Sequence, residues 1–200
     1  MGSLIVTAHP DPDSLTHHAA VALATALAEG DVTTAHLAQE GFDPRFTLDD
    51  RRAYAEQSVL DPAIRAEQDR IDSVDHLVLV FPVYWWSMPA LLKGWIDRVF
   101  VGGWAFEVGD DGRIVPKLGD LSVHLLAVSG TSRGSFARHG YLESFGTQIE
   151  HGIVDYCGAK RGVTAFVHDS ESEDVDAVAQ ELDAAVAAIA TAIAAPPSTA

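Results

Sequence analysis

The chain has 200 residues and a mass of 21.3 kDa, and its 48% hydrophobic and 21% charged residues are typical of one globular domain, which excludes a disordered or fibrous protein. Lys and Arg number 13 against 29 Asp and Glu, so the formal net charge of −16 disfavours binding to nucleic acid or to anionic lipid. The single cysteine, Cys157, cannot form an intrachain disulfide, and in the absence of zinc-spaced Cys and His residues we expect no bound metal.

The first half of the chain shows strands and helices in alternation. The apolar run 3–8 predicts a strand, and Ser14 is a candidate N-cap for the Ala-rich helix that follows a proline-containing loop. Residues 31–37 are rich in β-branched side chains and predict a second strand, whereas 39–75 is polar, with helical spacing in its second half only. The uninterrupted apolar segment 76–81 is typical of a strand covered on both faces, as in parallel sheets.

The second half continues the alternation. An apolar stripe predicts a helix from Ser87, its candidate N-cap, to Val99, and an Asp-Asp-Gly turn around Asp111 predicts a small hairpin. Two further strands are expected at 121–128 and 162–167, and two further helices at 141–157 and 174–194. This alternation is typical of the doubly wound α/β class, with helices on both faces of one parallel sheet. We expect a single domain over 1–195 and a frayed tail at 196–200.

In this class, ligands bind beyond the carboxyl ends of the strands, so the loops after the first, third and fourth strands are informative. The first loop brings together the hydroxyls of Ser14 and Thr16 and the free N–H groups of a helix start, an arrangement that can hold a phosphate. The structural alternative is that Ser14 only caps the helix while Pro10 and Pro12 stiffen the turn. Neither a Walker loop nor a Gly-x-Gly-x-x-Gly motif is present, which disfavours an ordinary dinucleotide site.

The other two loops predict a planar ligand. Tyr84, Trp85 and Trp86 follow the third strand, and their adjacency favours a wall for a flat aromatic molecule over a small aromatic core under the residues after 100. The loop 129–135 is small and polar, so its backbone can approach a ligand closely. Together the three loops favour a flavin mononucleotide moiety over a permanently bound nicotinamide.

One segment carries a family resemblance. Residues 81–100, FPVYWWSMPALLKGWIDRVF, continued by GWAF at 103–106, closely resemble the diagnostic segment of the flavodoxin-like NAD(P)H:quinone oxidoreductases. This family includes mammalian quinone reductases and ancillary subunits of bacterial potassium-efflux systems. Similar stretches at 4–10, 66–68 and 156–158 extend the resemblance over about residues 3 to 168. The resemblance implies a flavodoxin-like sheet of five parallel strands in the order 2-1-3-4-5, with helices on both faces.

The resemblance also implies a set of site residues. Around the phosphate, ribityl chain and ring of a flavin it places His9, Ser14, Leu15, Thr16, Pro82, Val83, Tyr84, Trp85, Trp86, Ser129 and Gly130. It implies a homodimer in which the segment with Trp104, Phe106 and Val108 reaches the partner's substrate pocket, which Phe136 also lines. Tyr84 and His139 are the candidate catalytic residues.

The chain departs from the family pattern after the fourth strand. Residues 128–131 read Val-Ser-Gly-Thr where family members usually show Thr-Thr-Gly-Gly, and Phe136 occupies a tyrosine position, which removes a hydroxyl. His139 matches the family's histidine when a gap is allowed.

We interpret Lys93 and Arg98 as solvating residues of their helix. The remaining histidines are expected at the surface or at helix ends: His17, His18, His36, His76, His124, His151 and His168.

The implied reaction is a two-step hydride transfer from NAD(P)H to the flavin and then to a quinone or similar flat acceptor in the same pocket. The motifs leave FMN or FAD, and NADH or NADPH, as open alternatives. A different hypothesis is a flavin-binding regulatory subunit of a membrane transport system, whereas the absence of Gly-x-Ser-x-Gly disfavours a hydrolase. The N-terminal residues lack a secretion-signal pattern and no apolar run reaches about 18 residues, so we expect a cytoplasmic protein with no membrane insertion.

Overall fold

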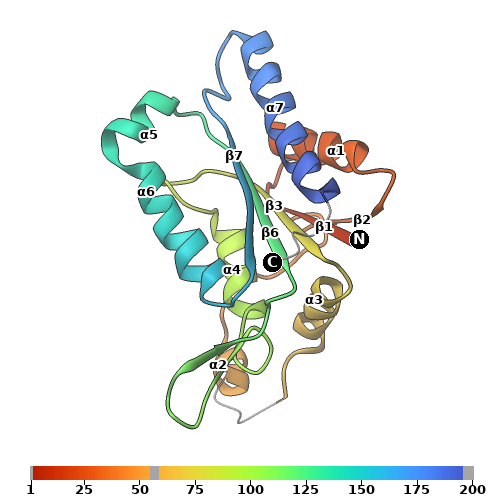
Figure 1. Cartoon of the computed structure of the whole chain (residues 1–200), viewed down its shortest axis with the longest axis vertical. Helices are drawn as coiled ribbons and strands as arrows, with labels where there is room; N and C mark the ends of the chain where they lie inside the picture. Colours follow the sequence, from red (N-terminus) through yellow and green to blue (C-terminus); the bar gives the residue numbers. More distant parts are fainter. Residues whose placement is uncertain (1, 55–58, 196–200) are drawn as a thin grey trace.

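The computed structural model describes residues 2–54 and 59–195, and the expected frayed tail at 196–200 lies outside these ranges. The main sheet has five parallel strands in the order β2-β1-β3-β6-β7 (Figure 1). These strands are β1 (Gly2–Thr7), β2 (Asp31–His36), β3 (His76–Pro82), β6 (Ser122–Val128) and β7 (Lys160–Val167). Counted within the sheet alone, this is the flavodoxin-like order 2-1-3-4-5, because β4 and β5 form a separate hairpin.

Helices cover both faces of the sheet (Figure 1). One face carries α1 (Leu15–Ala26) and α7 (Val175–Ala194), and the other carries α3 (Pro62–Asp72), α4 (Ala90–Val99) and η1, a π-helix at Gly146–Asp155. The side chains of β3 show why each face of the sheet has its own hydrophobic core, because successive side chains of a strand point to opposite faces. Leu79 and Phe81 belong to the core under α4, while Val78 and Val80 belong to the core under α1 and α7.

Among the described residues, α7 is the one helix long and apolar enough to cross a membrane. Its residues Leu182, Val186 and Ile189 are buried in the core that it shares with α1 and β7. Its Glu181 carboxylate accepts a hydrogen bond from the backbone N–H of His168 at 2.8 Å. These contacts are those of a core helix packed against a sheet.

A short helix, α2 (Leu48–Tyr54), forms in the part of 39–75 where no helix was predicted. Arg98 anchors it: the buried guanidinium donates to the Asp50 carboxylate at 3.0 to 3.1 Å and to the Asp43 carbonyl oxygen at 2.9 Å. The expectation that Arg98 only solvates α4 was therefore wrong. The partners lie 48 residues apart in the sequence, so local spacing did not indicate the pair.

The helix predicted at 141–157 is present, as an α-helical turn that passes into a π-helix, and a further short helix precedes it. α5 (Arg133–His139) forms at the end of the loop expected after the fourth strand, and Gly140, with φ of 69°, separates it from α6 (Tyr141–Phe145). α6 then continues into η1. A glycine in the left-handed region ends a helix at little steric cost, which is why the chain turns here.

Three histidines that were expected at the surface or at helix ends are buried: His17, His124 and His168. At the shift in register between β6 and β7, His124 Nδ1 accepts the backbone N–H of Val163 at 3.0 Å, and a Cβ on Gly162 would lie only 2.4 Å from that nitrogen. Burial, with a smaller effect of neighbouring His76, lowers the pKa of His124 to about 4. The ring thus acts as a neutral acceptor inside the sheet.

The predicted hairpin is present as β4 (Phe106–Val108) and β5 (Ile114–Pro116), paired antiparallel. It leads into the amino end of β6, so it lies at the opposite edge of the sheet from the loops after β1, β3 and β6. Figure 1 shows the hairpin at the bottom of the view and α5 near the top.

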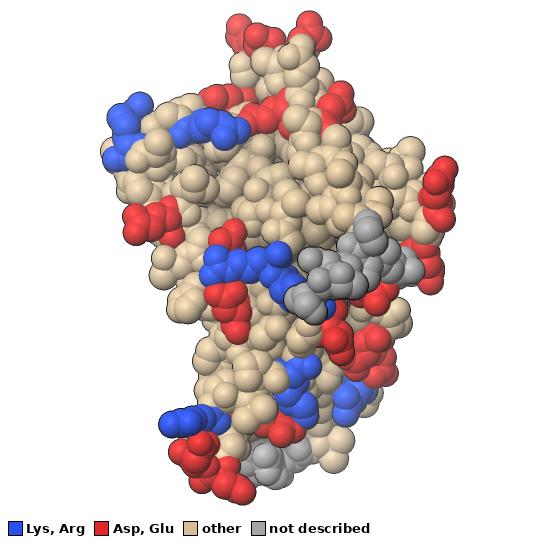
Figure 2. Space-filling view, viewed as in Figure 1, with Lys and Arg blue, Asp and Glu red and all other residues tan. Residues whose placement is uncertain are grey.

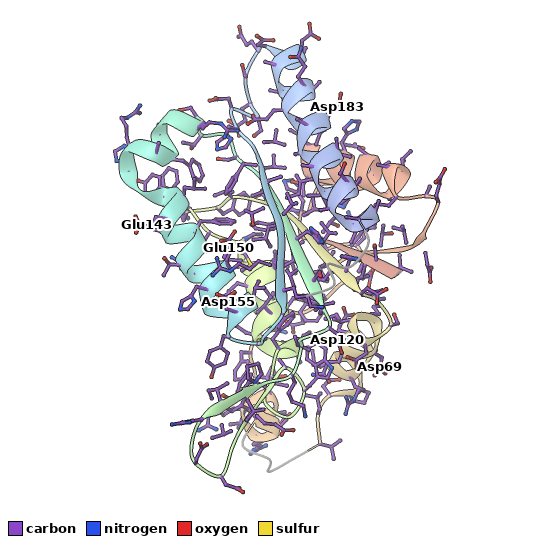
Figure 3. The ribbon with its side chains drawn as sticks, in the orientation of Figure 1. Asp69, Asp120, Glu143, Glu150, Asp155 and Asp183 are labelled. Carbon is purple, nitrogen blue, oxygen red and sulfur yellow. The ribbon has the colours of Figure 1, made fainter. Side chains whose placement is uncertain are left out.

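On the face seen in Figure 2, several Lys and Arg side chains lie beside Asp and Glu, whereas the acidic side chains at the top and at the upper right have no basic neighbour in view. Arg161 forms ion pairs with Asp155 and with Glu150. Figure 3 shows Glu150 on the side of η1 toward β7, where it accepts the Thr164 hydroxyl at 2.6 Å, while Glu143 lies on the outer side of α6. These pairs attach η1 to β7.

Candidate functional site

The loop after β1 forms a capped helix start. Ser14 is the N-cap of α1, and its Oγ accepts the backbone N–H of His17 at 3.3 Å. Leu15 and Thr16 occupy the first turn, where N–H groups have no intrahelical acceptor and the helix dipole is positive. The cap and the free N–H groups coexist, so the structural role of Ser14 leaves the phosphate hypothesis standing.

A pair of stacked histidines, His17 and His36, packs against this loop. The sequence analysis did not predict the pair. His17 Nε2 donates to Gln39 Oε1 at 3.2 Å, and its Nδ1 contacts Ser14 Oγ at the same distance. The His17 ring stacks on His36 with centroids 5.0 Å apart. His36 in turn contacts the Thr7 hydroxyl at 2.7 Å. Burial lowers the pKa of His36, and the neighbouring His17 lowers it further. The pair joins the ends of β1 and β2 to the start of α1.

The loop after β3 is a tight turn with unusual backbone angles. Tyr84 and Ser87 exchange two backbone hydrogen bonds of 3.0 and 3.1 Å, and between them Trp85 and Trp86 have φ of 48° and 65°. Such a turn favours Asn or Gly, and a non-glycine residue in the left-handed region costs about 1 to 3 kcal/mol. α4 begins only after Pro89, because Ser87 closes this turn instead of capping the helix as predicted.

The three aromatics of the turn do not form one wall. Trp85 is 92% exposed, and Tyr84 is half-exposed. Trp86 instead stacks face to face on Tyr141, with ring centroids 3.7 Å apart, and meets Phe136 edge-on at 5.9 Å. An aromatic cluster does form around Trp86, with partners from the segment after β6 and not from the residues after 100.

In the loop after β6, the backbone is accessible to a ligand at one position, Gly130. Ser129 is buried, its Oγ accepts the N–H of Thr131 at 3.1 Å, and its carbonyl oxygen accepts the N–H of Ser170 at 3.0 Å. Gly130 is exposed, and a Cβ there would approach Glu171 to 3.3 Å. The hydroxyl of Ser129 is therefore engaged within the protein, while the Gly130 backbone is open to a ligand.

The predicted residues of the following segment differ in accessibility. Phe136 is only 1% exposed and packs edge-on against Phe166 and His168, at 5.5 and 5.3 Å, as a core residue. His139 is exposed at the end of α5, and its ring stacks on Tyr141 at 5.3 Å. The structure therefore holds Phe136 behind the Trp86 cluster and leaves His139 accessible.

The hairpin residues lie at the other edge of the sheet. Trp104 Nε1 donates to the Asp72 carboxylate at 3.0 Å, and Phe106 is buried against Tyr156 with ring centroids 5.2 Å apart. Val108 is 66% exposed. Within one chain, these residues are not brought together with the loops that follow β1, β3 and β6.

Several cavities lie in the described part of the chain, and two of them illustrate their character. One, of about 750 Å³, is lined by the Asp50–Arg98 pair and further acids between α2 and α3. The other, of about 600 Å³, lies between η1, β7 and α7. The candidate flavin site is instead an open edge, formed by the α1 start, the exposed Trp85 and the Gly130 backbone. This edge offers hydrogen-bond donors for an anion, an aromatic face, and backbone that a ligand can approach closely. These features suit a planar ligand that carries a phosphate.

Fold and site together define a flavodoxin-like protein. A family model of the flavodoxin-like fold matches residues 1–193. Ribosyldihydronicotinamide dehydrogenase (quinone) of Pongo abelii is 31% identical over 182 residues, which cover 78% of this chain and 77% of that protein. The chain belongs to the family of flavodoxin-like NAD(P)H:quinone oxidoreductases, which confirms the resemblance in its sequence.

Two further comparisons agree. An uncharacterized NAD(P)H oxidoreductase of Escherichia coli strain K12 is 31% identical over 166 residues, covering 82% of this chain and 81% of that protein. The solved structure of an NAD(P)H:quinone oxidoreductase from Methanothermobacter marburgensis has a TM-score of 0.84 at 23% identity, covering 94% of this chain and 96% of the other. The second likeness concerns the fold.

Proposed function

We propose that the chain is a flavin-dependent NAD(P)H:quinone oxidoreductase. The observation that carries the proposal is the convergence of three features at the carboxyl ends of β1, β3 and β6: a helix start, an exposed indole and an open glycine backbone. Doubly wound sheets bind ligands at this edge. The names of relatives such as the Pongo abelii dehydrogenase, which acts on quinone, support the same activity.

A bound flavin supplies the redox chemistry, because it accepts a hydride from NAD(P)H and passes it to the acceptor. The N–H groups of Leu15 and Thr16 would hold its phosphate, beside the side chains of His9 and Ser14. Anion binding here needs no basic side chain, which suits a chain of net charge −16.

The other two loops would hold the ring. Pro82, Val83 and Tyr84 would line the flavin ring and the ribityl chain. Ser129 and Gly130 would line the outer edge of the ring. The exposed Trp85 offers an aromatic face to NAD(P)H and to the acceptor in turn. Tyr84 and His139 are both accessible and are able to move a proton at the mouth of the site.

A homodimer would complete the pocket. Val108, Ile114 and Val115 leave an apolar surface exposed on the hairpin, far along the sheet from the loops of the same chain. In a dimer, the hairpin with Trp104, Phe106 and Val108 would cover the partner's acceptor pocket. Phe136, which is buried in one chain, would contribute to that pocket only through the Trp86 cluster.

The proposed location is the cytoplasm. Cys157 is buried, and burial raises the pKa of its thiol to about 11, so the thiol stays packed and unreactive. Residues 1–195 would act there as one flavin-binding domain.

The test begins with the purified protein. Heat release of its cofactor, followed by chromatography and mass measurement, should yield a flavin and decide between FMN and FAD. NADH or NADPH should then be oxidised with menadione as acceptor. A colourless protein that refuses added flavin overturns the proposal, and a yellow protein with negligible turnover supports the regulatory-subunit alternative.

A further inference from the structure

The backbone of the turn after β3 is strained, and contacts within the turn do not account for this conformation. Trp85 and Trp86 both lie in the left-handed region, at φ of 48° and 65°, between the hydrogen-bonded Tyr84 and Ser87. Two consecutive indoles in this region need contacts from outside the turn to hold them there. Trp85 contributes little, because 92% of its surface is exposed.

Trp86 has the required contacts. Its indole stacks on the Tyr141 ring with centroids 3.7 Å apart and planes only 11° apart. Phe136, which is buried, supports both rings edge-on, at 5.9 Å from Trp86 and 6.1 Å from Tyr141. His139 stacks on Tyr141 as well, at 5.3 Å and 28°. Tyr141 is therefore the ring that contacts all the others.

Tyr141 is held independently of the turn. It is the first residue of α6 and follows Gly140, whose φ of 69° sets the direction in which the helix starts. A second link joins the same two segments, since the Ser87 hydroxyl donates to Gln148 Oε1 of η1 at 3.1 Å. The turn after β3 is thus attached to the segment after β6 at both Trp86 and Ser87.

We propose that Tyr141 is a positioning residue for the acceptor site. By stacking on Trp86 it holds the turn in the arrangement that exposes Trp85, and it leaves only the edge or the other face of Trp86 open to a ligand. The inference rests on the proposed function. Because the stack positions the aromatic surface and does not transfer hydride, its loss should weaken acceptor binding more than it slows turnover.

The positioning itself is measurable without cofactor. Acrylamide quenching of tryptophan fluorescence in flavin-free protein should increase about twofold in Tyr141→Ala, because the indole of Trp86 loses its covered face. Tyr141→Phe keeps the stacked ring and should behave as wild type. Tyr54→Ala, which removes an exposed tyrosine of α2, is the matched control. In a Trp86→Phe background, Tyr141→Ala should cause no further increase.

The consequence for function follows from kinetics of the flavin-loaded protein. In Tyr141→Ala, the KM for menadione should rise about fivefold while kcat changes less than about twofold, and Tyr141→Phe should restore the KM. Unchanged quenching in Tyr141→Ala, an unchanged KM, or a Tyr141→Phe variant as impaired as Tyr141→Ala overturns the inference. A wild type that oxidises no NAD(P)H instead defeats the proposed function, and the quenching comparison still decides whether Tyr141 positions Trp86.

Discussion

The two edges of the main sheet differ in where strained backbone lies. Near the amino edge, polar groups are buried and paired, as in the Arg98–Asp50 ion pair and the His124 ring that accepts the Val163 N–H. At the carboxyl edge, a turn with two strained tryptophans exposes one of them to solvent. The comparison teaches that both edges bury paired polar groups, as the His17–Gln39 contact shows at the carboxyl edge, while the strained turn lies at the edge proposed to bind ligands.

The largest effect is expected at the amino edge. Arg98→Ala leaves the buried Asp50 carboxylate without its partner, and removal of one member of a buried pair costs about 3 to 5 kcal/mol. Urea unfolding should show this loss in the free energy of unfolding. Lys93→Ala is the control on the same helix, because the exposed Lys93–Asp97 pair is worth at most about 1 kcal/mol. Equal losses in the two variants would contradict the assigned role of Arg98.

The next effect depends on pH. His124 has a pKa of about 4 in the folded chain, below its ordinary value of 6.5, so the native state favours the neutral ring. Its contribution is complete above pH 6.5 and is lost as pH falls toward 4, by about 3 kcal/mol in total. Urea titrations between pH 7 and 4 should show this fall. His124→Asn should make the curve shallower, while the lowered pKa values of His36 and His76 remain, and a curve as steep as wild type would refute the assignment.

A smaller effect is expected at the first loop of the carboxyl edge. Ser14→Ala removes the N-cap of α1 and should lower the free energy of unfolding by about 1 kcal/mol. Flavin affinity, measured by fluorescence titration, should fall as well, because the frayed first turn no longer presents its N–H groups. Ser14→Asp restores a cap but adds negative charge, so it should recover stability without recovering flavin affinity. Recovery of both would argue against a phosphate at this helix start.

The smallest effect has the opposite sign. Trp85→Gly relieves the left-handed strain of an exposed residue, and we expect the free energy of unfolding to rise by about 1 kcal/mol while the KM for menadione increases. Trp86→Gly relieves comparable strain but loses the Tyr141 stack, so it should be less stable than Trp85→Gly. Thermal unfolding of the two variants checks the order. The opposite order would mean that the stack does not hold the turn.

Most of the fold, and the loops that form the candidate site, followed from local patterns. The apolar run of β3, the N-cap at Ser14 and the Asp-Asp-Gly turn near Asp111 each describe neighbouring residues, and the structure contains each feature as predicted. α2 and α5 were missed, because both are short and the first is anchored by a partner far away in the chain.

The sequence by itself determined the order of strands and helices and the loops that meet at the carboxyl edge, because burial periodicity and capping act over a few residues. Only the tertiary structure decided that Arg98 is buried on Asp50, that His124 completes the sheet, and that Trp86 faces Tyr141 while Trp85 faces solvent. Each of these outcomes depends on contacts between residues tens of positions apart, whose packing no local pattern encodes.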